Sequence, residues 1–320
     1  MTNQRRADGS LRHLLTLEGL TRAEIETLLE QAQRFVRPFG APAPADHALD
    51  GVTIANLFTE PSTRTRVSFE LAGRRLGATV INIDPQLSSG VKGESMLDTV
   101  HTLESLHVDG FVIRTAEPGL IPHLAAHVGA HVSVFSGGEA HLSHPTQGLL
   151  DALTVRQRKG ERFGQLSLAI MGDLRHSRVA RSAATVFHAL GIGELRLIAP
   201  AALQPAADEF PGAARYSSPE EGLRGADVVM TLRIQKERMT AAEIPDGDAY
   251  FARYGLTGPR LRLARPDAIV LHPQPMNRGI EIASEVADGP QSAIRDQVRN
   301  GVAVRMAVLA SLLRPRAAQP

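Results

Sequence analysis

The sequence contains no cysteine among its 320 residues. This absence excludes disulfide bonds, a zinc site built on thiolates and a cysteine nucleophile. The chain also lacks an excess of charge of one sign, because 35 Lys and Arg residues face 34 Asp and Glu residues, for a net charge of +1. A protein that binds the nucleic-acid backbone usually carries a larger basic excess, so we expect no nucleic-acid partner.

Long hydrophobic runs are also missing. The most apolar stretch, AVRMAVLASLL near the C-terminus, is interrupted by Arg305, whereas a membrane span needs roughly 18 consecutive apolar residues. Near the N-terminus, Arg5 and Arg6 are not followed by the apolar segment that a secretory signal requires. We therefore expect a cytoplasmic protein that makes no contact with a membrane.

The sequence does contain a regular alternation of apolar runs and amphipathic segments, which is typical of a parallel α/β sheet. We expect strands at residues 52–58, 79–83, 110–114, 131–136, 166–174, 194–200, 226–232 and 269–272. We expect helices at residues 22–36, 61–76, 96–106, 148–158, 178–191 and 291–313. Thr21 and Glu24 fit a capping box at the start of the first of these helices. At roughly 150 residues per domain, the length predicts two domains, with a boundary within residues 137–152.

The strongest local signal is the string FTEPSTRTRVSFE at residues 58–70, which lies where a predicted strand turns into a helix. A helix N-terminus presents free N–H groups and partial positive charge, which suit an anion. Two hydroxyl groups and an arginine add donors at the same place. The alternative for such a pattern is an ordinary helix cap beside solvated arginines, and composition does not separate the two.

The whole string, however, resembles the phosphate-binding signature S-T-R-T-R of the aspartate/ornithine carbamoyltransferase family, and further motifs of that family follow in order. They are SSGVKGES at 88–95, VIR ending at Arg114, HPTQ at 144–147, GDLRHSR at 172–178, LRIQKER at 232–238 and HPQPMNRGIEI at 272–282. Each lies at the end of a predicted strand or in an adjacent loop, where ligands bind in open α/β sheets. The aspartate enzymes are the closer match, because HPxP stands where the ornithine enzymes have HCLP and the SMG motif of those enzymes is missing.

The resemblance implies a role for each matching residue. Those that would bind carbamoyl phosphate are Ser62, Thr63, Arg64, Thr65, Ser88, Arg114, His144, Gln147, Gln274 and Pro275. Those that would bind aspartate are Lys92, Arg178, Arg233 and Gln235, and those with catalytic roles are Arg64, Thr65, Lys92, Arg114 and His144. Arginine suits a phosphate dianion and two carboxylates because its planar fork binds oxyanions bidentately and keeps its charge.

The family's fold is α/β with two domains, each a parallel sheet flanked by helices, and an active site in the cleft between them. The resemblance assigns residues 1–145 to a carbamoyl-phosphate-binding domain, residues 146–291 to an aspartate-binding domain, and a C-terminal helix at about 292–320 to packing against the first domain. It also implies a homotrimer whose sites are shared between subunits, and it leaves room for a regulatory or dihydroorotase-like partner chain. Lys92 is one of only three lysines beside 32 arginines, which favours a specific role for it.

No cofactor and no metal are expected. Glu139, His141 and His144 are spaced closely enough to suggest a metal cluster, but a fourth ligand is missing. The implied reaction is transfer of the carbamoyl group to aspartate, a step of de novo pyrimidine biosynthesis. Two alternatives remain: a carbamoyltransferase for another amino acid or amine, and a non-catalytic paralogue that serves as an assembly subunit. A non-catalytic paralogue should have lost some of the cationic ligands, yet Arg64, Arg114 and Arg178 are all present.

Overall fold

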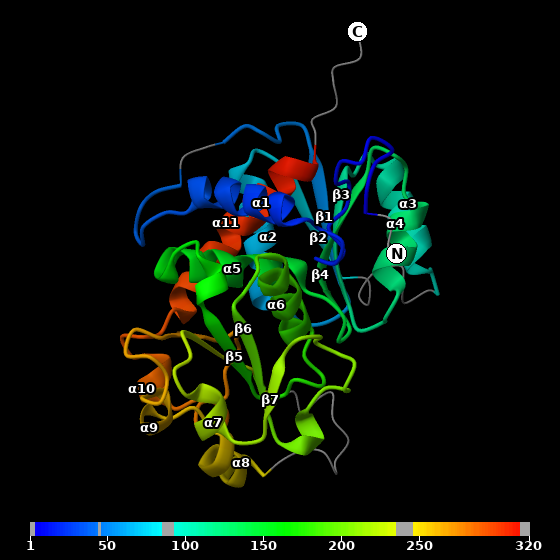
Figure 1. Ribbon diagram of the computed structural model, residues 1–320. Coiled ribbons are helices and arrows are strands. Elements are labelled where there is room, and N and C mark those ends of the chain that lie inside the picture. The colour runs from blue at the N-terminus through cyan, green and yellow to red at the C-terminus, as the bar shows by residue number, and fades with distance from the viewer. Residues whose placement is uncertain (1–3, 44–45, 85–92, 235–245, 314–320) are drawn as a thin grey trace. The chain divides into compact units, whose positions relative to one another are not determined.

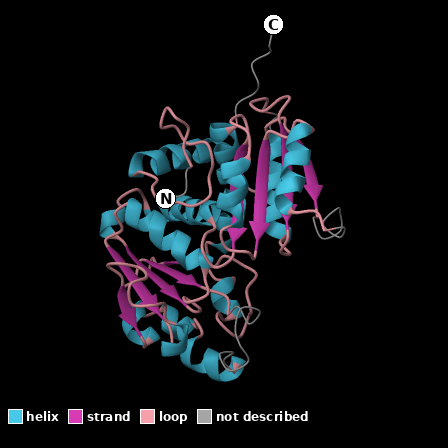
Figure 2. Cartoon of the chain, turned by 90° about the vertical axis from the view of Figure 1, so that its right-hand side faces the viewer, coloured by secondary structure: helices cyan, strands magenta, loops and turns pink. Residues whose placement is uncertain are grey.

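The computed structural model describes residues 4–43, 46–84, 93–234 and 246–313. The chain divides into two compact units, the first formed by residues 1–149 with 299–320 and the second by residues 150–298. Helices α5 (Pro145–Lys159) and α11 (Ile294–Leu312) each begin in one unit and end in the other. Each unit combines a parallel sheet with helices, as the sequence predicts (Figures 1 and 2).

The first unit contains a parallel sheet of strand order β2-β1-β3-β4. Its strands are β1 (Thr53–Phe58), β2 (Thr79–Ile83), β3 (Gly110–Thr115) and β4 (Ser133–Glu139). The helices of this unit are α1 (Arg22–Phe35), α2 (Thr63–Arg75), α3 (Met96–Ser105) and α4 (Leu120–His127). Strands β1, β3 and β4 are buried along nearly their whole length. Burial on both faces explains why these strands appear in the sequence as continuous apolar runs.

The second unit contains a parallel sheet of strand order β7-β6-β5-β8-β9. Its strands are β5 (Ser167–Met171), β6 (Glu194–Ile198), β7 (Ala214–Tyr216), β8 (Val228–Thr231) and β9 (Ile269–Leu271). Its helices are α6 (Arg178–Ala189), α7 (Pro219–Leu223), α8 (Gly247–Tyr254), α9 (Gly258–Leu261) and α10 (Ser284–Ala287), with short 3₁₀ turns η3 (Phe163–Gln165) and η4 (Ala201–Leu203). One buried cluster joins strand residues such as Met171 and Val229 to Ile282, which lies outside the strands.

Most of the predicted elements are present, and the differences have local causes. Strand β4 continues to Glu139, beyond the predicted end at residue 136, because Glu139 pairs with Thr115 of β3. Helix α5 begins at Pro145, three residues earlier than predicted, since proline is well suited to the first turn of a helix. The short elements α4, β7, α7, α8, α9 and α10 were not predicted, and α11 ends at Leu312. No helix in the described part of the chain is long and apolar enough to cross a membrane.

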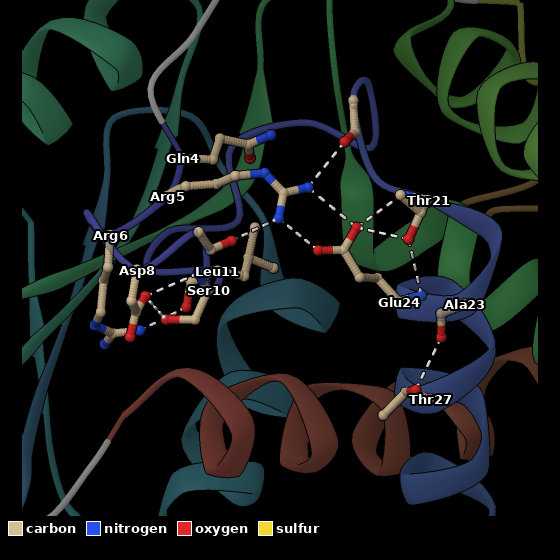
Figure 3. A network of polar contacts seen from close by, with 12 residues as sticks. Gln4, Arg5, Arg6, Asp8, Ser10, Leu11, Thr21, Ala23, Glu24 and Thr27 are labelled. Atoms are coloured by element: carbon tan, nitrogen blue, oxygen red, sulfur yellow. Dashed lines mark hydrogen bonds and ion pairs between the residues drawn. The ribbon is translucent and has the colours of Figure 1, made fainter.

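The N-terminal segment is fixed to the start of α1 by a polar network (Figure 3). The Arg5 guanidinium donates to the Glu24 carboxylate, with Nη2 3.0 Å from Oε2. Glu24 also closes the predicted capping box, accepting from the Thr21 N–H while the Thr21 hydroxyl accepts from the Glu24 N–H. The hydrogen bond from Arg5 is the main reason that the pKa of Glu24 falls to about 2.

His13 is a buried neutral histidine in the first unit, only 1% exposed. Its Nδ1 accepts a hydrogen bond of 2.9 Å from the Val134 N–H, and burial lowers its pKa from 6.5 to about 3. The unfolded ring therefore takes up a proton at a higher pH than the folded ring does. Stability should be lost as the pH falls from about 6.5 towards 3, by about 1.4 kcal/mol per pH unit.

We predict that a shift from pH 7 to pH 5 lowers the free energy of unfolding by about 2 kcal/mol through His13 alone. Denaturant unfolding at several pH values measures this effect. In His13→Asn the slope of unfolding free energy against pH between pH 5 and pH 6.5 should shrink by the contribution of one proton. An unchanged slope in His13→Asn would show that another group causes the acid sensitivity.

Candidate active site

In the first unit, the predicted phosphate-binding residues lie at the point where the strand order reverses. Strand β1 has β2 on one side and β3 on the other, so the connections that leave the carboxyl ends of β1 and β3 run to opposite sides, and such a point is where ligands bind in open α/β sheets. Ser62 is the residue before α2, four residues after the end of β1, and Arg114 is the next-to-last residue of β3. The Thr59 N–H donates to the Arg114 carbonyl oxygen at 2.9 Å, which joins the two strand ends.

The N-terminus of α2 differs from those of α1, α3 and α6. In α1, α3 and α6 a Thr or Ser side chain at the N-cap accepts from a first-turn N–H. In α2, which the structure describes completely, Ser62 makes no such cap and the first turn holds no acidic residue. Thr63 and Arg64 are exposed there, and Thr65 is buried. The first N–H groups of α2 are therefore suited to bind an anionic ligand.

Arg114 is held in a defined orientation by neighbouring strand ends. Its Nη1 donates to the Gly137 carbonyl oxygen in β4 at 3.1 Å, and its Nε lies 3.3 Å from Oε2 of Glu60. The side chain is only 14% exposed. Glu60 and Gly137 were missed by the sequence reasoning. Glu60 lies two residues before Ser62, within the same sequence motif, and this position could have identified it as a residue near the candidate site.

His144 and Gln147 are brought to the start of α5. Both are buried, at 5% and 8% exposure, and the Gln147 N–H donates to the His144 carbonyl oxygen at 2.9 Å. Glu139, at the end of β4, accepts from the N–H groups of Gly119 and Ile121, and burial raises its pKa. Glu139 thus has a structural role at the start of α4. Within the described residues, no group of three or more His, Asp or Glu side chains could hold a metal ion.

In the second unit, the strand order reverses between β5 and β8, and the two predicted aspartate arginines follow those strands. Gly172 has φ of 126°, and a Cβ there would lie 2.6 Å from the Leu232 carbonyl oxygen. Glycine therefore lets the segments after β5 and β8 approach closely. Arg178 is the first residue of α6 and 6% exposed, and half-buried Arg233 stands two residues after β8.

Gln274 and Pro275 follow β9, the strand next to β8, and are joined by a cis peptide bond. His272 fixes this turn, since its Nδ1 accepts from the Gln274 N–H at 2.9 Å while its Nε2 lies 3.1 Å from the Glu281 carboxylate. His272 and Glu281 are both buried. The main chain of Gln274 is therefore held in place by a contact that does not involve its own side chain.

The structure thus gathers the candidate residues into two sets. Ser62, Thr63, Arg64, Thr65, Arg114, His144 and Gln147 belong to the first unit, and Arg178, Arg233, Gln274 and Pro275 belong to the second. Each set lies at or just beyond the carboxyl ends of the strands of its own sheet. Ser88, Lys92 and Gln235 lie outside the described residues.

Comparison with family models matches both units of the chain. Residues 12–157 match the carbamoyl-phosphate-binding domain of aspartate/ornithine carbamoyltransferases, and residues 164–312 match the aspartate/ornithine-binding domain. The chain belongs to the aspartate/ornithine carbamoyltransferase family.

Solved structures support the same assignment. Aspartate transcarbamoylase from Trypanosoma cruzi in complex with carbamoyl aspartate and phosphate is 32% identical, with a TM-score of 0.85 over 94% of this chain and 96% of that one. The same enzyme in complex with carbamoyl phosphate and aspartate is 30% identical, with a TM-score of 0.84 over 94% and 97% of the two chains. Ornithine carbamoyltransferase from Thermus thermophilus is 27% identical, with a TM-score of 0.82 over 95% and 100%. The protein is therefore a carbamoyltransferase by family, related to enzymes of both specificities.

Proposed function

We propose that this carbamoyltransferase transfers the carbamoyl group of carbamoyl phosphate to the α-amine of L-aspartate, giving N-carbamoyl-L-aspartate and phosphate. The observation that carries the choice of aspartate is the pair of arginines, Arg178 and Arg233, beyond the ends of β5 and β8. Two fixed cations suit a substrate with two carboxylates. Ornithine carries a cationic side chain, which the same pair of arginines would repel.

The first unit would bind and activate carbamoyl phosphate. Ser62, Thr63, Arg64 and Thr65 hold the phosphate at the α2 N-terminus, where backbone N–H groups and side-chain donors converge. Arg114, together with Thr65 and His144, polarises the carbamoyl oxygen and stabilises the oxyanion that develops on it. Gln147 and the main-chain carbonyls of Gln274 and Pro275 orient the carbamoyl NH₂ group.

In the reaction, the uncharged amine of aspartate attacks the carbamoyl carbon to form a tetrahedral intermediate. The C–O bond to phosphate then breaks, and phosphate leaves with the electron pair of that bond and takes up the proton that the amine nitrogen loses. Catalysis rests on positioning and on charge stabilisation, with no covalent intermediate on the protein. We further propose a cytoplasmic homotrimer in which Ser88 and Lys92 reach the site of a neighbouring subunit.

A direct assay tests this function. Phosphate release from carbamoyl phosphate is measured with aspartate, with ornithine and with no amine, and mass spectrometry identifies the product. We expect release with aspartate only and a product with the mass of carbamoyl aspartate. Release with ornithine would identify the other substrate class, and no release with any amine tested would favour a non-catalytic paralogue.

We predict that Arg233→Ala raises the aspartate KM by about one to two orders of magnitude, because a charge-assisted hydrogen bond contributes about 1.5–3 kcal/mol. Binding of carbamoyl phosphate should stay nearly unchanged, since its ligands lie mainly in the first unit. Steady-state kinetics with each substrate varied in turn provides the measurement. Exposed Arg253 in α8, replaced by Ala, is the matched control. Equal weakening of both substrates would contradict the role of Arg233.

A further inference from the structure

Arg305 is a buried cation in the middle of α11. The residue is 4% exposed. Its Nη1 donates to the Gly301 carbonyl oxygen at 3.0 Å, and its Nε has no hydrogen-bond partner. Among the residues that the structure describes, no carboxylate forms an ion pair with it. Burial alone lowers its pKa, to about 10, so the group still carries its positive charge at neutral pH.

The guanidinium of Arg305 lies against the inner face of α2, which is beside α11 in Figure 1. Its Cζ is 5.0 Å from the centre of the Phe69 ring. Thr65 and Phe69 are both buried residues of α2, and Phe69 follows Thr65 by four residues, or one helical turn. Four residues rise about 6 Å along an α-helix. The charge of Arg305 therefore contacts α2 about one helical turn from its first turn.

We infer that Arg305 acts as a long-range positive charge that strengthens binding of the phosphate dianion at the N-terminus of α2. A buried charge without a counter-ion is costly for the folded protein. A dianion bound at the α2 N-terminus would partly offset that cost across an interior of low dielectric constant, where Coulomb attraction is only weakly screened. The inference rests on the proposed phosphate site, to which it adds a positioning residue that does not touch the ligand.

An electrostatic role predicts that removing the charge of Arg305 weakens phosphate binding without lowering the stability of the fold. Replacing an unpaired buried charge by an apolar side chain of similar size is neutral or stabilising in other proteins. Arg305→Met should therefore unfold at the same or a higher denaturant concentration, while the Kd for inorganic phosphate rises about tenfold. Arg305→Lys, titrated below the pKa of the buried amine, keeps the charge and should bind phosphate within about twofold of the wild-type protein at the same pH.

Calorimetric titration of the full-length protein with inorganic phosphate, beside denaturant unfolding of each variant, tests the inference. Arg12→Met is the matched control, because Arg12 also lies in the first unit and donates to the main-chain carbonyls of Val128 and Val132. Both residues precede β4, which is separated from β1 by β3. Its phosphate Kd should remain that of the wild-type protein.

Three results would overturn the role of Arg305. They are an unchanged Kd in Arg305→Met, equal weakening in Arg305→Lys and Arg305→Met, and failure of Arg305→Met to fold. Equal weakening in both variants would indicate a purely steric role for the side chain, and failure to fold would show that the charge is required for folding. Absence of phosphate binding by the wild-type protein would instead contradict the proposed phosphate site itself, so the two failures are distinguishable.

Discussion

Replacement of Arg114 by alanine is expected to lower kcat/KM for carbamoyl phosphate about a thousandfold. The loss of a single preorganised donor to a developing oxyanion costs about 2.7–4 kcal/mol in other enzymes. Arg114 suits this role because Glu60 and the Gly137 carbonyl fix its guanidinium at the junction of β1, β3 and β4 before substrate binds. Steady-state kinetics with carbamoyl phosphate varied at saturating aspartate measures the loss.

Arg196 provides the matched control for this experiment. Its side chain is 13% exposed, close to the 14% of Arg114. It donates to the carbonyls of Gly222 and Arg224 and pairs with Glu194, but it lies in β6 of the second unit. Arg196→Ala should cost stability while leaving kcat/KM nearly unchanged. A similar kinetic loss in both variants would mean that Arg114 supports the fold rather than the reaction.

The second large effect is expected from mixing two inactive variants. If the proposed shared site is correct, Arg64→Ala and Lys92→Ala should each be nearly inactive as pure trimers, because Arg64 would act in its own subunit and Lys92 in the neighbour's site. After dissociation and joint reassembly, some sites combine an intact Arg64 with an intact neighbouring Lys92. Random assembly from equal amounts makes about one quarter of the sites complete, so about one quarter of wild-type activity should return.

A second mixture controls for activity that returns on reassembly without a shared site. Arg64 and Arg114 both belong to the first unit of the same chain, so Arg64→Ala mixed with Arg114→Ala leaves every site incomplete and should recover nothing. Native mass spectrometry verifies that hybrid trimers form in both mixtures. Hybrids of Arg64→Ala and Lys92→Ala without activity would refute the shared site and place Lys92 in its own subunit's site or in a structural role.

The sequence alone determined the local structure and the order of the motifs. The capping box at Thr21 and Glu24 is present as predicted, and α2 ends at Arg75 just before Gly77, which has φ of 88°. Both signals are local, since a helix start or stop depends on residues within about one turn of each other. The family assignment was likewise available from sequence, because its motifs are short strings with fixed chemistry.

Strand order, in contrast, depended on contacts between distant segments. The sequence showed that apolar runs alternate with helices, but no local pattern specified that β1 would lie between β2 and β3. That order places Glu60 beside Arg114 and brings the segment before α2 to the candidate site. The close approach of Gly172 to Leu232 has the same origin. A pairing between strands far apart in sequence depends on how whole faces pack, which single-segment periodicity does not encode.

Arg305 shows the difference most clearly. In the sequence it only interrupts an apolar stretch and so argues against a membrane span. In the folded chain the same residue is buried against Phe69, beneath the helix that begins the candidate phosphate site. Sequence determines that a charge is present, but burial decides its electrostatic effect, because the strength of a charge's field depends on the medium that surrounds it. That medium exists only once α2 and α11 have packed together.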